Sequence, residues 1–228
     1  MEKPIYTEII GLYTINIYID NTPTNPREWD NLGTLVAFED HKAHYTIWES
    51  TTSYLDFLYS AGEIPNLYEE QDEEAENPPA PSLEELLHME KSKSEIVWFP
   101  LDSTNNGYDD QIKIVTKHPT NHIDYNEPNG VICARIQDIK RNLQVTEISP
   151  EVRENVEDIL QSEIKSLNQY ISGECYGYVI QETNSLENEE IDSCWGFIGD
   201  YKYCLEEARS YVKSLPNQLT LPFTEKGA

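Results

Sequence analysis

Apolar side chains recur every three or four residues between positions 152 and 171, and this pattern limits the possible folds more than any other. Such spacing places them on one face of an α-helix of about six turns. The apolar residues are Val152, Val156, Ile159, Leu160, Ile164, Leu167 and Ile171. Ser149 suits the N-cap, Pro150 the first helical position, and Gly173 the residue after the end. The sequence therefore predicts a long amphipathic helix at about 150–171, which needs a partner for its apolar face.

Short runs rich in β-branched and aromatic residues flank this helix on both sides and predict strands. The expected strands are 4–19 as one extended element, 33–38, 95–99, 111–115, 130–134, 174–182 and 191–197. Asn105–Gly107 is typical of a hairpin turn. The expected shorter helices are 50–60, capped by Ser50, Thr51 or Thr52, then 82–89, 134–143 and 201–215. Strands and helices without a regular βαβ repeat predict an α+β fold with a mixed or antiparallel sheet and a C-terminal helix. The length predicts a single domain over 1–228.

The charge of this chain is strongly one-sided. Asp and Glu number 42 against 16 Lys and Arg, a formal net charge of -26. Solubility needs only roughly 2–8 net charges in a small domain. Because phosphates would be repelled, the excess argues against direct binding of nucleic acid or an anionic membrane. No apolar stretch approaches the ~20 residues of a membrane span, and no signal pattern follows Met1, so we expect a cytoplasmic protein. An aromatic content of 11% distinguishes the chain from a disordered acidic tail.

Two acidic segments are candidate contacts for a basic partner. Residues 66–81 predict an acidic, proline-rich loop within the domain. Its charges are Glu69, Glu70, Asp72, Glu73, Glu74 and Glu76. On the long helix, Glu151, Glu154 and Asp158 follow one another at spacings of three and four, which lines them along one face. Duplex DNA carries one charge per about 1.7 Å, so 26 charges correspond to roughly 44 Å of duplex, close to the expected diameter of such a domain.

Two further clusters combine acidic side chains with tryptophan. The first holds Arg27, Trp29, Asp30 and Asn31, and the second holds Asp192, Trp195 and Asp200. Each offers a possible anchor or ligand site, with a stacking face beside charged groups. The alternative is structural. In that interpretation Arg27 pairs with a carboxylate, Asp30 and Asn31 bond nearby amides, and Trp29 covers the edge of the core.

These two clusters lie in segments that resemble a group of uncharacterised phage- and plasmid-encoded proteins. The matching residues are Asn25 to Gly33, with the sequence NPREWDNLG, and Asp192 to Asp200, with the sequence DSCWGFIGD. The resemblance rests on two short motifs that bracket most of the chain. It implies a mobile genetic element as the context and implies no catalytic activity.

We therefore expect an acidic binding protein that inhibits a host nucleic-acid-binding defence system, a restriction or CRISPR-type nuclease, by mimicking the charge of nucleic acid. Its partner would be a basic protein surface in the cytoplasm of an infected or plasmid-bearing bacterial host. Glycine-rich nucleotide motifs are missing, so we expect no cofactor and no catalytic residues. One alternative is a small hydrolase or ligand-binding protein that uses a divalent metal at Asp30, Asp192 and Asp200. Another is a halophile-like acidic surface without a specific partner.

Metal binding and thiol chemistry receive weaker support from the sequence. His41 with His44 and His118 with His122 could form a zinc site only if two loops converged. The four cysteines form no CxxC pair, so we expect small buried apolar side chains rather than disulfides or metal ligands.

Overall fold

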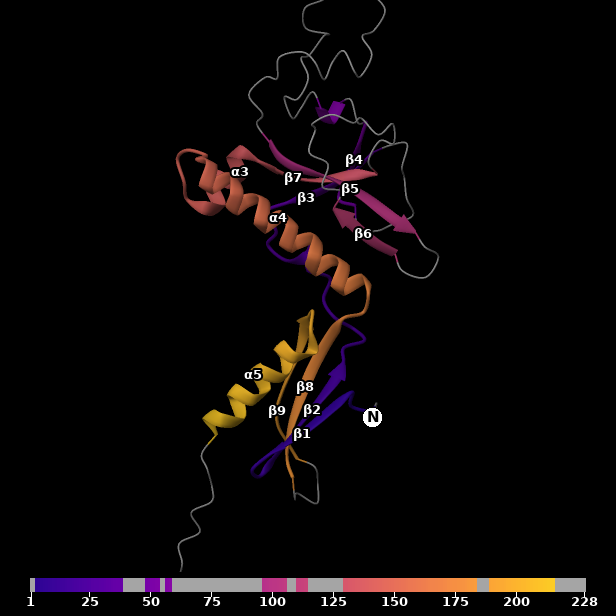
Figure 1. Cartoon of the computed structure of the whole chain (residues 1–228), viewed down its shortest axis with the longest axis vertical. Helices are drawn as coiled ribbons and strands as arrows, with labels where there is room; N and C mark the ends of the chain where they lie inside the picture. Colours follow the sequence, from indigo (N-terminus) through magenta and orange to yellow (C-terminus); the bar gives the residue numbers. More distant parts are fainter. Residues whose placement is uncertain are drawn as a thin grey trace, which may run out of the picture. The chain divides into compact units, whose positions relative to one another are not determined.

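A computed structural model describes residues 3–38, 48–53, 56–58, 96–105, 110–114, 129–183 and 189–215 (Figure 1). Contacts divide the chain into two compact units. Residues 1–25 and 169–228 form the terminal unit, and residues 26–168 form the central unit. The single domain over 1–228 stays a prediction.

The terminal unit contains a four-stranded antiparallel sheet in the order β1-β2-β8-β9. Its strands are β1 (Tyr6–Ile10), β2 (Tyr13–Ile19), β8 (Cys175–Glu182) and β9 (Glu190–Ile198). The expected single strand over 4–19 is wrong. Gly11 has a φ of 62°, and the chain reverses there so that Tyr6 pairs with Ile17. Alternating apolar residues continue on both sides of this turn, which conceals it from a search for strand periodicity.

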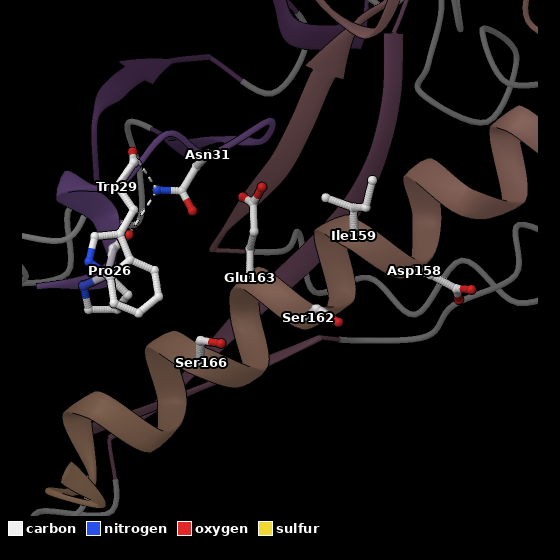
Figure 2. Close-up of a pocket in the computed structure, with 8 residues that line it drawn as sticks. All are labelled: Pro26, Trp29, Asn31, Asp158, Ile159, Ser162, Glu163 and Ser166. Atoms are coloured by element: carbon white, nitrogen blue, oxygen red, sulfur yellow. Dashed lines mark hydrogen bonds between the residues drawn. The ribbon is translucent and has the colours of Figure 1, made fainter. Parts of the chain in front are cut away.

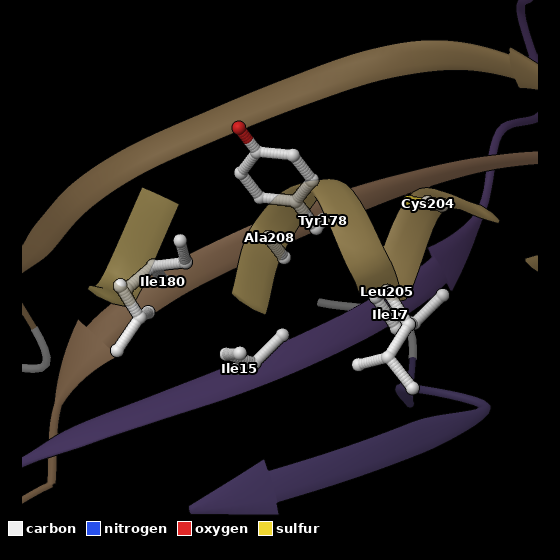
Figure 3. Packing of buried hydrophobic residues seen from close by; sticks show 8 residues of the cluster. Ile15, Ile17, Tyr178, Ile180, Cys204, Leu205 and Ala208 are labelled. Carbon is white, nitrogen blue, oxygen red and sulfur yellow. The ribbon is translucent and has the colours of Figure 1, made fainter. Parts of the chain in front are cut away.

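Helix α5 (Tyr201–Ser214) covers one face of the terminal sheet (Figures 1 and 3). Ile15 and Ile17 of β2 are fully buried, as is Ile180 of β8, and they lie on the same face because strand side chains alternate. The apolar face of α5 packs against them through Cys204, Leu205, Ala208 and Val212. This cluster is the core of the terminal unit.

The central unit contains a five-stranded mixed sheet in the order β4-β3-β7-β5-β6. Its strands are β3 (Thr34–Phe38), β4 (Ser50–Thr52), β5 (Ile96–Asn105), β6 (Asp110–Ile114) and β7 (Gly130–Arg135). Only β3 and β4 pair in parallel; the other pairs are antiparallel. The antiparallel pairing of β5 with β6 confirms the predicted hairpin.

The expected helix over 50–60 is wrong at its start, because Ser50–Thr52 pairs with β3 as strand β4. Ser53, rather than an earlier residue, caps the helical residues 56–58: its Oγ accepts a hydrogen bond of 3.0 Å from the Asp56 N–H. Phe57 and Leu58 then join the buried cluster on one face of the sheet. The other members of this cluster are Val36, Phe38, Ile96, Val131 and Cys133.

Helices α3 (Ile136–Leu143) and α4 (Pro150–Ile171) follow β7. The predicted α4 N-cap is confirmed, since Ser149 Oγ accepts a hydrogen bond of 3.2 Å from the Val152 N–H. The buried residues of α4 are Val156, Leu160, Ile164 and Leu167. Gly173, with a φ of 72°, follows its end. The predicted α+β class, the long helix and the C-terminal helix are confirmed.

Several expectations fall outside the described residues: the loop at 66–81, the helix at 82–89 and all the histidines. All four cysteines are described, and all are free thiols; Cys133, Cys175 and Cys204 are buried, whereas Cys194 is exposed. Among the helices that the structure describes, none has both the length and the apolar character needed to cross a bilayer.

Candidate functional site

The NPREWDNLG segment forms a 3₁₀ turn, η1 (Pro26–Glu28), and a loop that leads into β3. Within it, the Arg27 side chain is only 7% exposed, and its guanidinium bridges two carboxylates. Nε donates to Glu49 Oε1 at 2.8 Å, Nη1 donates to Glu163 Oε2 at 3.0 Å, and Nη2 donates to the Gly33 carbonyl at 2.6 Å. Arg27 thus has the structural role that the sequence left as an alternative.

Glu163 of α4 holds the same loop from the helix side. Its carboxylate accepts a hydrogen bond from the Leu32 N–H at 2.7 Å and from the Gly33 N–H at 3.2 Å, besides the Arg27 contact. A Cβ at Gly33 would lie 2.6 Å from Leu160 Cδ2, so a larger residue there would require neighbouring side chains to shift. The loop is therefore fixed against α4.

Asn31 also has a local structural role. Its Nδ2 donates to the Pro26 carbonyl at 2.8 Å and to the Trp29 carbonyl at 3.1 Å, which closes the loop. Trp29 does not cover the core edge fully: its residue surface is 49% exposed, and Asp30 is exposed as well. A large, half-exposed indole on a fixed loop is the feature of this segment that its internal contacts do not explain.

A groove of about 300 Å³ lies between this loop and α4 (Figure 2). The loop contributes Pro26, Trp29 and Asn31. Helix α4 contributes Asp158, Ile159, Ser162, Glu163 and Ser166. In Figure 2, Pro26 and Trp29 lie toward the Ser166 end of this helical stripe, and Asp158 lies at the other end. The groove thus combines apolar and aromatic walls with hydroxyl groups and one exposed carboxylate.

The three acidic residues predicted on α4 are all exposed in the structure: Glu151, Glu154 and Asp158. Within the described part of the chain, none of the three side chains forms a hydrogen bond or an ion pair. Asp158 belongs both to this acidic face and to the groove. The helix therefore connects one predicted charge cluster to the surroundings of Trp29, whereas the acidic residues at 69–76 lie outside the described residues.

The second predicted cluster belongs to the terminal unit, and each of its residues has a local partner there. Asp192 accepts a hydrogen bond of 2.9 Å from the Tyr178 hydroxyl, and Asp200 caps α5 by accepting 3.0 Å from the Lys202 N–H. The Trp195 ring lies over Gly177, where a Cβ would collide with the indole. These contacts give Asp192 and Asp200 structural roles, whereas Trp195 stays about half exposed, as Trp29 does.

Burial is the main cause of the raised pKa values of three cysteines and of Tyr178. Burial raises the pKa of the Cys133 thiol to about 11 and that of Cys204 to about 12, and it raises the pKa of Cys175 as well. Burial, reinforced by the hydrogen bond to Asp192, also raises the pKa of Tyr178. These three thiols are protonated at neutral pH, which makes them poor nucleophiles and poor metal ligands.

The metal-dependent alternative uses Asp30 of the central unit together with Asp192 and Asp200 of the terminal unit. Among the described residues, no three His, Cys, Asp or Glu side chains are grouped so as to hold a metal ion. That alternative stays a prediction.

Sequence reasoning missed Glu49 and Glu163 as partners of Arg27, and it missed the hydroxyl groups of the groove. One signal was available: Asp158, Ser162 and Ser166 are four residues apart, so they form a polar stripe beside the apolar one.

No protein-family model, curated protein or solved structure matches the chain.

Proposed function

We propose that this protein binds a basic protein surface and thereby inhibits a host nucleic-acid-binding defence protein, such as a restriction or CRISPR-type nuclease. It would act in the cytoplasm of a bacterium that carries a phage or plasmid. Its acidic residues would take the place of nucleic-acid phosphates in the cationic groove of the target. No catalytic step is part of this function.

One observation carries the proposal: Glu151, Glu154 and Asp158 are exposed along α4 with no partner among the described residues. Like charges at helical spacings of three or four destabilise a helix by about 0.2–0.5 kcal/mol per pair. Arginine and lysine side chains of a partner would remove this repulsion, and the charges would speed association.

The distribution of charge along the sequence gives further support. The central unit has 29 acidic and 11 basic residues, a formal charge of −18, whereas the terminal unit has 13 and 5, a formal charge of −8. Arg27 is nearly buried between carboxylates, so it adds little positive charge to the surface. The central unit, which contains most of the acidic helix α4, therefore carries most of the excess negative charge.

The mobile-element context comes from the resemblance of residues 25–33 and 192–200 to phage and plasmid proteins. Host nucleases that cut foreign DNA bind its phosphates through Lys and Arg, so an acidic protein surface of suitable shape would compete with DNA for them. Many proteins have basic surfaces, and this context favours defence nucleases among them as the partner.

A panel of purified restriction and CRISPR-type nucleases tests the proposal. We expect the protein to inhibit DNA cleavage by at least one member and to compete with DNA for it. Direct binding should weaken at least tenfold as salt rises from about 50 to about 500 mM, because charge contacts are screened. Absence of inhibition across the panel, or affinity that is independent of salt, would contradict the proposal.

A pair of matched variants separates the α4 face from net charge. Glu151→Gln with Glu154→Gln should weaken both binding and inhibition. Glu206→Gln with Glu207→Gln removes the same number of exposed charges from α5 in the terminal unit and should have a smaller effect. Equal effects of the two pairs would mean that net charge alone, and not the α4 face, determines binding.

A further inference from the structure

We propose that the groove beside Trp29 receives an extended, arginine-containing segment of the basic partner, with one arginine stacked on the Trp29 indole and a second positive charge at Asp158. This inference rests on the proposed function and names the part of the surface where the partner is anchored. The groove lies wholly within the central unit.

The dimensions of the groove suit such a segment. Asp158 and Ser166 are eight residues apart on α4, which corresponds to about 12 Å along the helix axis. An extended chain covers this length in about four residues. The volume of about 300 Å³ lies at the small end of ligand pockets, which favours one or two side chains over a large cofactor.

The walls of the groove suit the chemistry of arginine. Trp29, 49% exposed, offers an aromatic face for a planar guanidinium, and Pro26 and Ile159 offer apolar contact for its aliphatic stem. The hydroxyl groups of Ser162 and Ser166 can accept hydrogen bonds from the segment. Guanidinium groups stack on aromatic rings and are weakly hydrated, so arginine is favoured over lysine here.

The carboxylates at the groove outnumber the one arginine, Arg27, that lies close to it. Arg27 pairs with both Glu49 and Glu163, so these three charges together amount to −1. Asp158 adds a second negative charge and has no partner among the described residues. Because Glu163 is already engaged by Arg27 and by two backbone N–H groups, Asp158 is the groove carboxylate left to meet an incoming cation.

The test uses the full chain and three peptides, each acetylated and amidated. The first has the sequence Gly-Arg-Gly-Gly-Arg-Gly, and in the other two lysine or neutral citrulline replaces arginine. Binding is followed by the indole N–H signal of Trp29 in ¹H–¹⁵N spectra, assigned by its loss in Trp29→Phe. We expect this signal to shift with the arginine peptide, to shift less with the lysine peptide, and to stay in place with the citrulline peptide.

Variants of the full chain then locate the contact. Trp29→Leu and Asp158→Asn should each weaken binding of the arginine peptide about two- to fivefold. Glu206→Gln is the matched control, because it removes one exposed carboxylate from α5 in the terminal unit, outside both the acidic face of α4 and the groove. Asp158 is exposed, so its variant tests the proposal even if Trp29→Leu impairs folding.

The outcomes distinguish this inference from the proposed function. An unmoved Trp29 signal at saturating arginine peptide, or an equal shift with citrulline, would overturn the groove assignment. Full nuclease inhibition by the double variant Trp29→Leu with Asp158→Asn would also overturn the groove assignment. In that case the proposed function would remain valid. A Trp29 shift with arginine alone, without inhibition of any nuclease, would support the groove and refute the proposed function.

Discussion

Arg27 Nη1 lies 3.0 Å from Glu163 Oε2, and both side chains are almost fully buried, with exposures of 7% and 11%. The pair is separated by 136 positions in the sequence. It joins the loop before β3 to the middle of α4, and Glu163 also lines the groove beside Trp29. One residue, Glu163, thus takes part both in the packing of the loop and in the candidate site.

Removal of the Glu163 carboxylate should destabilise the protein. Glu163→Ala removes one of the two carboxylates that pair with Arg27 and leaves two backbone N–H groups without this acceptor. We expect the free energy of unfolding to fall by about 3 kcal/mol, the low end for one partner of a buried pair, because Glu49 remains. Urea unfolding measures this loss. Glu154→Ala, at an exposed position of α4, should change stability by less than about 0.5 kcal/mol.

Gly33→Ala should also weaken the contact between the loop and α4. The added methyl group would lie 2.6 Å from Leu160 Cδ2 and 2.7 Å from Ile132 Cγ1, so the two side chains must move. We expect a loss of about 1–3 kcal/mol, as for other overpacked cores. Thermal unfolding measures this loss, and Thr34→Ala, at the adjacent exposed position, is the control. An unchanged melting temperature for Gly33→Ala would refute the close approach.

The N-cap of α5 offers a test in the terminal unit. Asp200→Ala removes the acceptor for the Lys202 N–H and should cost about 0.5–2 kcal/mol of unfolding free energy. Asp200→Asn and Asp200→Ser keep an N-capping oxygen and should retain most of the stability. If asparagine and alanine destabilised the protein equally, the capping role would be wrong, and the charge of Asp200 would matter instead.

Stability should decline at alkaline pH because of the buried thiols. The pKa of Cys204 is raised from 9.0 to about 12, and that of Cys133 to about 11, mainly by burial. Above pH 9 the unfolded chain loses these protons while the folded chain keeps them. Each thiol therefore lowers the free energy of unfolding by up to about 1.4 kcal/mol per pH unit, until its own folded pKa is reached.

Urea unfolding at about pH 8, 9.5 and 10.5 measures this decline. Cys204→Ala should make the loss of stability with pH less steep. The matched control is Cys194→Ala, which removes an exposed thiol and should leave the steepness unchanged. A wild-type stability that is constant over this range would contradict the burial of the two thiols.

Elements with strong local signals were predicted well. The apolar period and the Ser149 cap identify α4, and β-branched runs identify strands such as β3 and β7, because these signals depend on neighbouring residues only. The hairpin turn within 4–19 and the short strand β4 were missed. At Gly11 the alternation continues through the turn, and β4 is recognisable only through its pairing with β3.

The sequence by itself determined the α+β class, the position of α4 and the excess of negative charge, since periodicity, capping and composition are local or additive properties. Only the tertiary structure decided that Arg27 pairs with Glu49 and Glu163, and that Trp29 borders a groove with Asp158. It also decided that Asp192 bonds the Tyr178 hydroxyl and that Asp200 caps α5 within the terminal unit. These relationships join residues far apart in the chain. They depend on which faces pack together, and side-chain patterns along one segment do not encode that choice.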